Sequence, residues 1–148
     1  NIWSEDDTQV KVYFTSVETI DSNEGAQLEV RDLDQEKLIL NAQEGSRIYA
    51  EVTLKELEAR VITGGEILVK GIIDNQKIEV RAGGNFNGEQ LISKNADVDV
   101  KAGGKANVYA SENFRGKVTA GGNIQVFGNP KEVDTKKTLG GNIKIIKK

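Results

Sequence analysis

A pair of adjacent glycines recurs about every 19 residues along this chain. Two looser copies, Gly25-Ala26 and Gly45-Ser46, precede the pairs at intervals of 20 and 19 residues. The full pairs follow at intervals of 19, 20, 18 and 19 residues, at Gly64-Gly65, Gly83-Gly84, Gly103-Gly104, Gly121-Gly122 and Gly140-Gly141. A fixed period of this length is typical of repeat architectures. Seven repeats therefore account for nearly all of residues 1–148, which we expect to form a single domain.

Apolar and polar residues alternate on both sides of each glycine pair, which predicts strands with one buried face. Polar residues occupy the position four before the pair and, apart from Ile62, the position two before it. The column directly before it, which includes Thr63, Ala82 and Leu139, is small or apolar, so we group it with the buried face. The apolar columns stand five and three residues before the pair and two and four after it, as in Ala59, Val61, Ile67 and Val69 and in Ile78, Val80, Phe86 and Gly88.

These patterns predict an all-β fold, a right-handed parallel β-helix of about seven coils. Each repeat reads as strand, glycine corner, strand, and glycine suits the corner because it reaches positive φ without steric cost. The remaining residues, such as 88–97 or 111–115, would close the coil along a third side. Stacking at about 4.8 Å pairs each strand with its copies, and parallel connections are overwhelmingly right-handed. Residues 53–60 look helical locally, but their repeat position predicts loop and strand.

Composition removes several classes of function. The absence of cysteine and histidine excludes disulfides and the Ser-His-Asp and Cys-His arrangements, and leaves few metal ligands, so we predict no catalytic residues, cofactor or metal. The net charge of −3 is spread along the chain, which argues against a nucleic-acid partner. No apolar run approaches the roughly 20 residues of a membrane span. Because methionine is also absent, we expect a trimmed start with any targeting signal upstream.

Two sets of polar columns are candidate sites. Arg60, Glu79, Asp99 and Lys117 would stack in that order, as a carboxylate pair for calcium or acid–base chemistry, or as a solvated ladder balanced by Arg81 and Lys101. The amides after the corner would form hydrogen-bonded ladders or line a sugar-binding surface. These amides are Asn85, Asn123 and Asn142, then Asn87, Asn107 and Gln125.

An apolar column five positions after the corner is the candidate ligand- or partner-binding site. Tyr109, Phe127 and Ile146 follow Lys70 and Glu89 in this column. If the three point outward, they form a patch for a sugar, a protein or another subunit. If the strand bends there, they belong to the core.

Both ends of a solenoid expose strand edges that need protection from further pairing. Lysines would provide it at the C-terminal end. At the other end, aromatic residues would cover the first coil or mark where preceding sequence has been cut away. These residues are Lys144, Lys147 and Lys148, and Trp3, Tyr13 and Phe14.

Four short runs in the second half of the chain carry a family resemblance. They are residues 98–104 (VDVKAGG), 109–114 (YASENF), 126–131 (VFGNPK) with Val133, and 140–143 (GGNI). These runs resemble the family of putative auto-transporter adhesins called the head GIN domain. The resemblance is strongest over residues 59–146 and extends more loosely to Val10. It implies a bacterial, typically Bacteroidetes-type, exported β-helix at the cell envelope or outer membrane, with adhesion proposed and no accepted catalytic residues.

The leading hypothesis is therefore a non-enzymatic binding or structural module of the cell surface. Its partner would be a glycan or a surface protein, and a homo-oligomer is compatible with the fold. One rival is a polysaccharide lyase or hydrolase, for which Glu79, Asp99, Arg81 and Lys101 approximate the acids and cations required. The other is a bactofilin-like scaffold that polymerises end to end.

Overall fold

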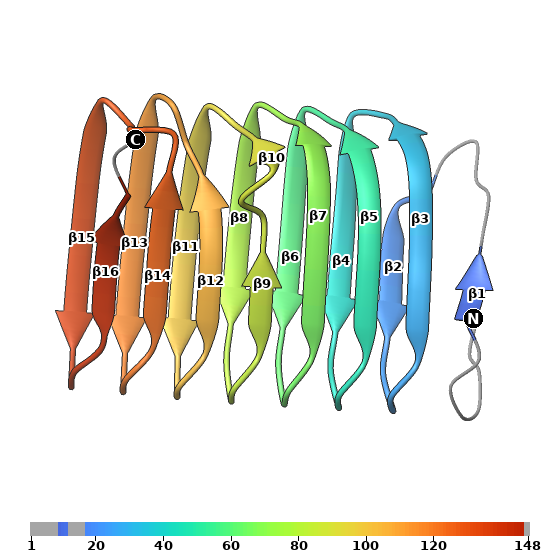
Figure 1. The fold of residues 1–148 in the computed structure, drawn as a ribbon, viewed down its shortest axis with the longest axis horizontal. Helices are drawn as coiled ribbons and strands as arrows, with labels where there is room; N and C mark the ends of the chain where they lie inside the picture. Colours follow the sequence, from blue (N-terminus) through green and yellow to red (C-terminus); the bar gives the residue numbers. More distant parts are fainter. Residues whose placement is uncertain (1–8, 12–16, 147–148) are drawn as a thin grey trace.

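The chain folds into a right-handed parallel β-solenoid, as the sequence predicts (Figure 1). The computed structural model describes residues 9–11 and 17–146. In Figure 1 the strands of the nearer sheet run upward, those of the more distant sheet run downward, and the chain advances from right to left. This combination defines a right-handed coil.

Two sheets face each other across the core, and we name them sheet A and sheet B. Within each sheet the strands pair in parallel with the strand one coil earlier and one coil later, except at the ends and at the divided coil of β9 and β10. Sheet A contains β1 (Gln9–Lys11), β3 (Gln27–Asp34), β5 (Arg47–Thr53), β7 (Glu66–Ile72), β9 (Asn85–Asn87), β10 (Leu91–Ile92), β12 (Lys105–Tyr109), β14 (Asn123–Phe127) and β16 (Asn142–Ile145). Sheet B contains β2 (Thr19–Ser22), β4 (Lys37–Ala42), β6 (Glu56–Val61), β8 (Asn75–Val80), β11 (Asn95–Lys101), β13 (Asn113–Thr119) and β15 (Glu132–Thr138).

The predicted third side is wrong for the part of the chain that the structure describes, because only two sheets form. Residues 113–115, assigned to a closing segment, begin β13 instead. Short closing turns carry the chain from sheet A back to sheet B, opposite the glycine corners. Strand β6 covers Glu56–Val61, which confirms that the fold overrides the local helical preference there.

The glycine corners are tight turns from sheet B to sheet A. At each corner the residue before the pair has φ between 49° and 61°, and the first glycine or its equivalent has φ between 74° and 87°. At the Gly83 corner, the Gly84 amide donates to the Arg81 carbonyl at 3.0 Å. Two successive positive φ values with this hydrogen bond are those of a type I′ turn.

This geometry corrects the grouping of Thr63, Ala82, Ala102, Ala120 and Leu139 with the buried face. All five are exposed at the corner, and Leu139 retains 80% of its accessible surface. The second glycine of each pair has a different task. A Cβ on Gly84 would lie 2.7 Å from the Val61 carbonyl oxygen, so the coil spacing at this corner favours glycine. The first two corners accommodate the buried Cβ atoms of Ala26 and Ser46 at the same position.

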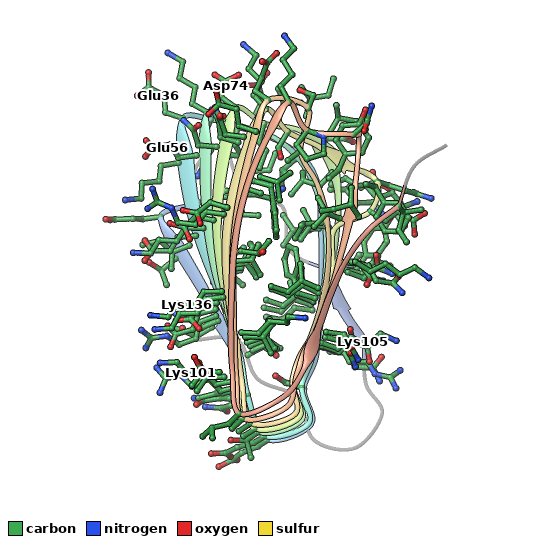
Figure 2. The ribbon with its side chains drawn as sticks, turned by 90° about the vertical axis from the view of Figure 1, so that its left-hand side faces the viewer. Glu36, Glu56, Asp74, Lys101, Lys105 and Lys136 are labelled. Atoms are coloured by element: carbon green, nitrogen blue, oxygen red, sulfur yellow. The ribbon has the colours of Figure 1, made fainter. Side chains whose placement is uncertain are left out.

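The remaining apolar columns form the core, as predicted. The side chains of Val61, Val80, Val100 and Val118 are fully buried, and the columns after the corner face them from sheet A. Phe114 fills part of the space that a side chain at Gly116 would occupy, since a Cβ there would lie 2.4 Å from the Phe114 ring. Figure 2 shows side chains packed between the two sheets along the whole solenoid.

Among the residues that the structure describes, no helical segment has the length and apolarity needed to cross a bilayer. Lys144 is exposed on β16, in keeping with the expected edge protection. The expectations for Trp3, Tyr13, Phe14, Lys147 and Lys148 lie outside the described residues.

Candidate binding surfaces

The structure brings Tyr109, Phe127 and Ile146 together at the closing-turn end of sheet A. Tyr109 of β12 and Phe127 of β14 are register partners, and the Ile146 amide donates to the Val126 carbonyl at 2.8 Å. All three side chains are half-buried, between the two alternatives that the sequence left open. They line a shallow groove of about 310 Å³, which we call the aromatic groove, together with Glu89, Gly128 and Asn129.

The turn after β14 shapes this groove. Gly128 and Asn129 both have positive φ, 91° and 53°. A Cβ on Gly128 would lie 2.8 Å from Cε1 of Tyr109, so glycine allows the ring to pack against the turn. The Gly-Asn-Pro run therefore has a local structural cause, and it places the Asn129 amide beside two aromatic rings.

The groove combines aromatic rings with one carboxylate and one amide. Sugar rings stack their apolar faces on aromatic side chains, whereas carboxylate and amide groups accept and donate hydrogen bonds to hydroxyls. Glu89 reaches the groove because the coil that contains it is divided into β9 and β10, with residues 88–90 between them. The binding role of Tyr109, Phe127 and Ile146 stays a prediction.

A second hollow runs along the outer face of sheet B, with a volume of about 670 Å³, and we call it the sheet B trough. One border is an amide ladder in which Asn113 Nδ2 donates to Asn95 Oδ1 at 2.8 Å and Asn95 Nδ2 donates to Asn75 Oδ1 at 2.9 Å. This ladder was not predicted, because its three residues stand eight positions before their glycine pairs, outside the columns that align around each pair. Among the amides predicted to form ladders after the corner, Asn142 Nδ2 donates to Asn123 Oδ1 at 3.2 Å.

The predicted charge ladder of Arg60, Glu79, Asp99 and Lys117 is formed on sheet B in that order. Glu79 makes an ion pair with Arg60 at 3.3 Å and a second with Arg81. Asp99 lies beside Glu79 in register and is 3.8 Å from the Lys101 ammonium. Each carboxylate thus has its own cation, the balanced arrangement expected of a ladder. In the described part of the chain, no group of three or more carboxylates could hold a metal ion.

Tyr49 on β5 is an outward aromatic residue that the sequence analysis did not name. Arg31 and Lys70 lie 5.3 Å and 5.5 Å from its ring centroid, and its hydroxyl donates to Glu51 at 2.7 Å. The hydrogen bond from Arg31 to Glu29 raises the pKa of Arg31 above its usual value. Its strand position, third after a corner, is the signal that marks Tyr49 as outward. Tyr49 lines a separate hollow of about 260 Å³ on sheet A, and two cations lie over its ring.

The sequence model of the family described as "Putative auto-transporter adhesin, head GIN domain" matches residues 1–130. Among the curated proteins, none matches this chain. A solved structure of a putative adhesin from Bacteroides fragilis is similar with a TM-score of 0.81 and 17% identity, covering 88% of this chain and 61% of that one.

A second solved structure, of a putative lipid binding protein from Parabacteroides distasonis, has a TM-score of 0.67 and 17% identity over 94% of this chain. This chain spans 61% of the length of that neighbour as well. At such identities the two likenesses establish the shared solenoid fold.

Proposed function

This chain belongs to the head GIN domain family of putative auto-transporter adhesins, and from that premise we propose that it is a non-enzymatic binding module of the bacterial cell envelope. Its place would be outside the cytoplasm, where an adhesin meets its partner. The rigid, parallel coils provide a frame, and the closing turns provide the surface that varies between coils. We propose a carbohydrate as the ligand and the aromatic groove as its site.

The observation that carries this proposal is the meeting of Tyr109, Phe127, Asn129 and Glu89 in one open groove of about 310 Å³. A groove of this size accommodates one or two sugar rings, in the range of known small-ligand sites. The half-buried aromatic rings offer apolar surface for stacking. Glu89 and Asn129 offer the hydrogen-bonding partners that fix the orientation of a sugar.

The arrangement of charges supports binding over catalysis. A glycosidase needs two carboxylates on either side of a scissile bond, with different proton affinities. Glu79 and Asp99 are instead neighbours in one ladder, and each is close to a cation. Neither lines the aromatic groove.

The test is a glycan and polysaccharide array probed with the purified domain. The informative variant is Tyr109→Leu/Phe127→Leu, which keeps apolar bulk in the groove but removes both aromatic faces. Tyr49→Leu is the matched control, because it removes an aromatic residue of the same sheet outside the groove. We expect specific binding by the parent and the control, and at least a tenfold loss in the double variant, since one stacked ring contributes about 1 kcal/mol.

A second variant separates the polar contacts. Asn129→Gly keeps the positive φ of the turn, which glycine adopts freely, and removes only the amide. Weaker binding with unchanged thermal stability would place the ligand at this amide. Absence of binding by the parent, or full binding by the folded Leu double variant, would refute the assignment of the groove.

The enzymatic alternative has its own assay. Depolymerisation of polysaccharides is measured with the parent and with Glu79→Gln/Asp99→Asn. We expect no turnover by either protein. Turnover that disappears in the double variant would overturn the non-enzymatic proposal.

A further inference from the structure

Two columns of charged residues run along the outer face of sheet B, over strands β8, β11, β13 and β15. The strand register stacks Lys77, Asp97, Arg115 and Asp134 in one column, which we call the first ladder. The same register stacks Glu79, Asp99, Lys117 and Lys136 in the second ladder. Figure 2 shows the side chains of this face projecting away from the core, with Lys136 among them.

The first ladder alternates in sign but its charges are not paired within the chain. All four of its residues are exposed, and in the described ranges none of them makes an ion pair or a side-chain hydrogen bond. Lys117 and Lys136 of the second ladder are also exposed and equally without a partner among the described residues.

A third column, at the closing turns, shows that charges of alternating sign can form ion pairs within the chain. There the ammonium groups of Lys55, Lys94 and Lys131 pair with the preceding carboxylates at 3.6, 3.6 and 3.2 Å. Their partners, in the same order, are Glu36, Asp74 and Glu112. The two ladders therefore carry six charges, those of Lys77, Asp97, Arg115, Asp134, Lys117 and Lys136, that the described residues leave available to a partner.

We propose that this face of sheet B binds a second copy of this chain. The two solenoids would pack face to face with antiparallel axes, related by a two-fold axis parallel to the strands that passes between β11 and β13. A second copy is the partner that matches the face by construction, because it repeats its charges at the same inter-strand spacing of about 4.8 Å. An interface of this kind presents the same patch from both subunits.

The two-fold axis places opposite charges against each other in both ladders. In the first ladder, Asp97 meets the partner's Arg115, and Lys77 meets the partner's Asp134. In the second ladder, Asp99 meets the partner's Lys117, and Glu79 meets the partner's Lys136. Every one of these contacts occurs twice by symmetry. Beside them, Asn95 meets the partner's Asn113, so the amide ladders also face each other.

The charges select this register over its neighbours. Moving one subunit by one coil places a charged residue of the first ladder opposite its own copy. Moving it by two coils, toward the N-terminal end, keeps the first ladder complementary but sets Glu79 against the partner's Asp99 and Arg60 against the partner's Lys117. Like charges opposite each other disfavour an interface, so the ladders specify one pairing.

The size of the face sets the expected strength. Four strands of about seven residues span about 19 Å by 23 Å, or roughly 440 Å² on each copy. Stable interfaces bury about 800 Å² on each partner. We therefore expect a weak dimer that forms at high protein concentration and dissociates as salt screens the charges. The aromatic groove belongs to sheet A, so it stays open in this dimer.

The experiment is sedimentation velocity over a range of protein concentrations, at low and high salt. Asp97→Lys sets cation against cation across the interface, and Arg115→Asp sets carboxylate against carboxylate. Each variant alone should associate at least about tenfold more weakly than the parent. An equimolar mixture of the two variants should dimerise again, because each variant then meets the opposite charge on the other.

The mixture separates an interface from a folding defect. Each substitution also adds like charges to its own ladder and lowers the stability of the subunit, but mixing does not change that effect. Lys136→Glu provides a second control. It places a carboxylate beside Lys117 of its own sheet, which favours the subunit, and opposite the partner's Glu79, which disfavours the dimer.

Three results would overturn the proposal. The parent could remain monomeric at the highest concentration and lowest salt, or Lys136→Glu could dimerise as well as the parent. The mixture of Asp97→Lys and Arg115→Asp could also stay as monomeric as its components. If the parent is monomeric and the Asp97→Lys variant loses glycan binding, the sheet B trough is assigned to a ligand instead.

Discussion

Replacing each glycine of one corner with alanine separates the two physical demands on that corner, and Gly83 and Gly84 are the pair to compare. Gly83 has φ of 76°, and a Cβ there would meet no atom within 4 Å. Gly84 has no such φ, but its Cβ would lie 2.7 Å from the Val61 carbonyl oxygen. The first substitution therefore strains the backbone, whereas the second forces two coils apart.

The magnitudes follow from these contacts. An alanine in the left-handed region costs about 1–2 kcal/mol. Overpacking costs about 1–3 kcal/mol, and we expect the upper half of that range at Gly84 because the Val61 carbonyl also accepts the Arg81 amide at 2.9 Å. Loss of glycine freedom in the unfolded chain offsets about 0.4–1 kcal/mol in both variants, so it cancels between them. Gly84→Ala should be less stable than Gly83→Ala by about 1 kcal/mol.

The assay is thermal and urea denaturation followed by circular dichroism. A difference of 1 kcal/mol corresponds to about 2–4 °C in Tm for a chain of this size. Both probes are needed because stacked repeats do not always unfold in one step. Ala82→Gly is the control, since it relieves a positive φ of 49°. It should keep or raise stability, because about 1–2 kcal/mol of relieved strain is at least as large as the cost of about 0.4–1 kcal/mol for glycine freedom in the unfolded chain. A Gly83→Ala variant as unstable as Gly84→Ala would refute the reasoning.

Two further predictions concern the core. Phe114→Ala should lower the free energy of unfolding by about 3–5 kcal/mol in urea denaturation, and Phe114→Leu/Gly116→Ala should lose less than the sum of its single variants, because the new Cβ occupies space that the ring vacates. Gln76→Leu should change stability by less than about 1 kcal/mol. It loses the hydrogen bonds that Nε2 donates to Ser93 at 2.8 Å and to the Tyr109 carbonyl at 3.1 Å, but it also removes the buried Oε1, which has no partner among the described residues, and Ser93 still donates to the Tyr109 carbonyl. A loss above about 1 kcal/mol on Gln76→Leu would contradict this account.

The period-two columns around the glycine pairs were sufficient to predict the strands, their register and the core. Val61, Val80, Val100 and Val118 are register neighbours in sheet B, as the repeat alignment implies. The register could be predicted because one sequence repeat corresponds to one coil of the solenoid. Any two residues one repeat apart become neighbours in one sheet.

The sequence did not reveal why the residue before the pair is small. Apolar character suggested burial for Ala82 and Leu139, whereas both lie in the exposed, left-handed position of the turn. A strained turn position and a buried position can hold the same residue types. The residue types in this column therefore do not show which of the two positions it is. The prediction of a third side failed at residues 113–115, which were interpreted as a closing segment because Phe114 is their single apolar residue, whereas they already belong to β13.

The candidate site depends on the closing turns, where the repeat is least regular. The intervals between glycine pairs vary from 18 to 20 residues, yet strands β8, β11 and β13 keep one register across a 20- and an 18-residue interval. In the first 20-residue interval the extra residue forms a bulge in β3, between Val30 and Leu33. Beyond β8 the closing side absorbs the variation, as residues 88–90 do between β9 and β10 in the second 20-residue interval. The chain is also irregular after β14, where Gly128 and Asn129 have positive φ. Because the aromatic groove draws on both irregular segments, repeat averaging hides its shape. The regular faces instead turn each column into a linear series of charges, which is why a contact between two copies can be specified by residues one repeat apart.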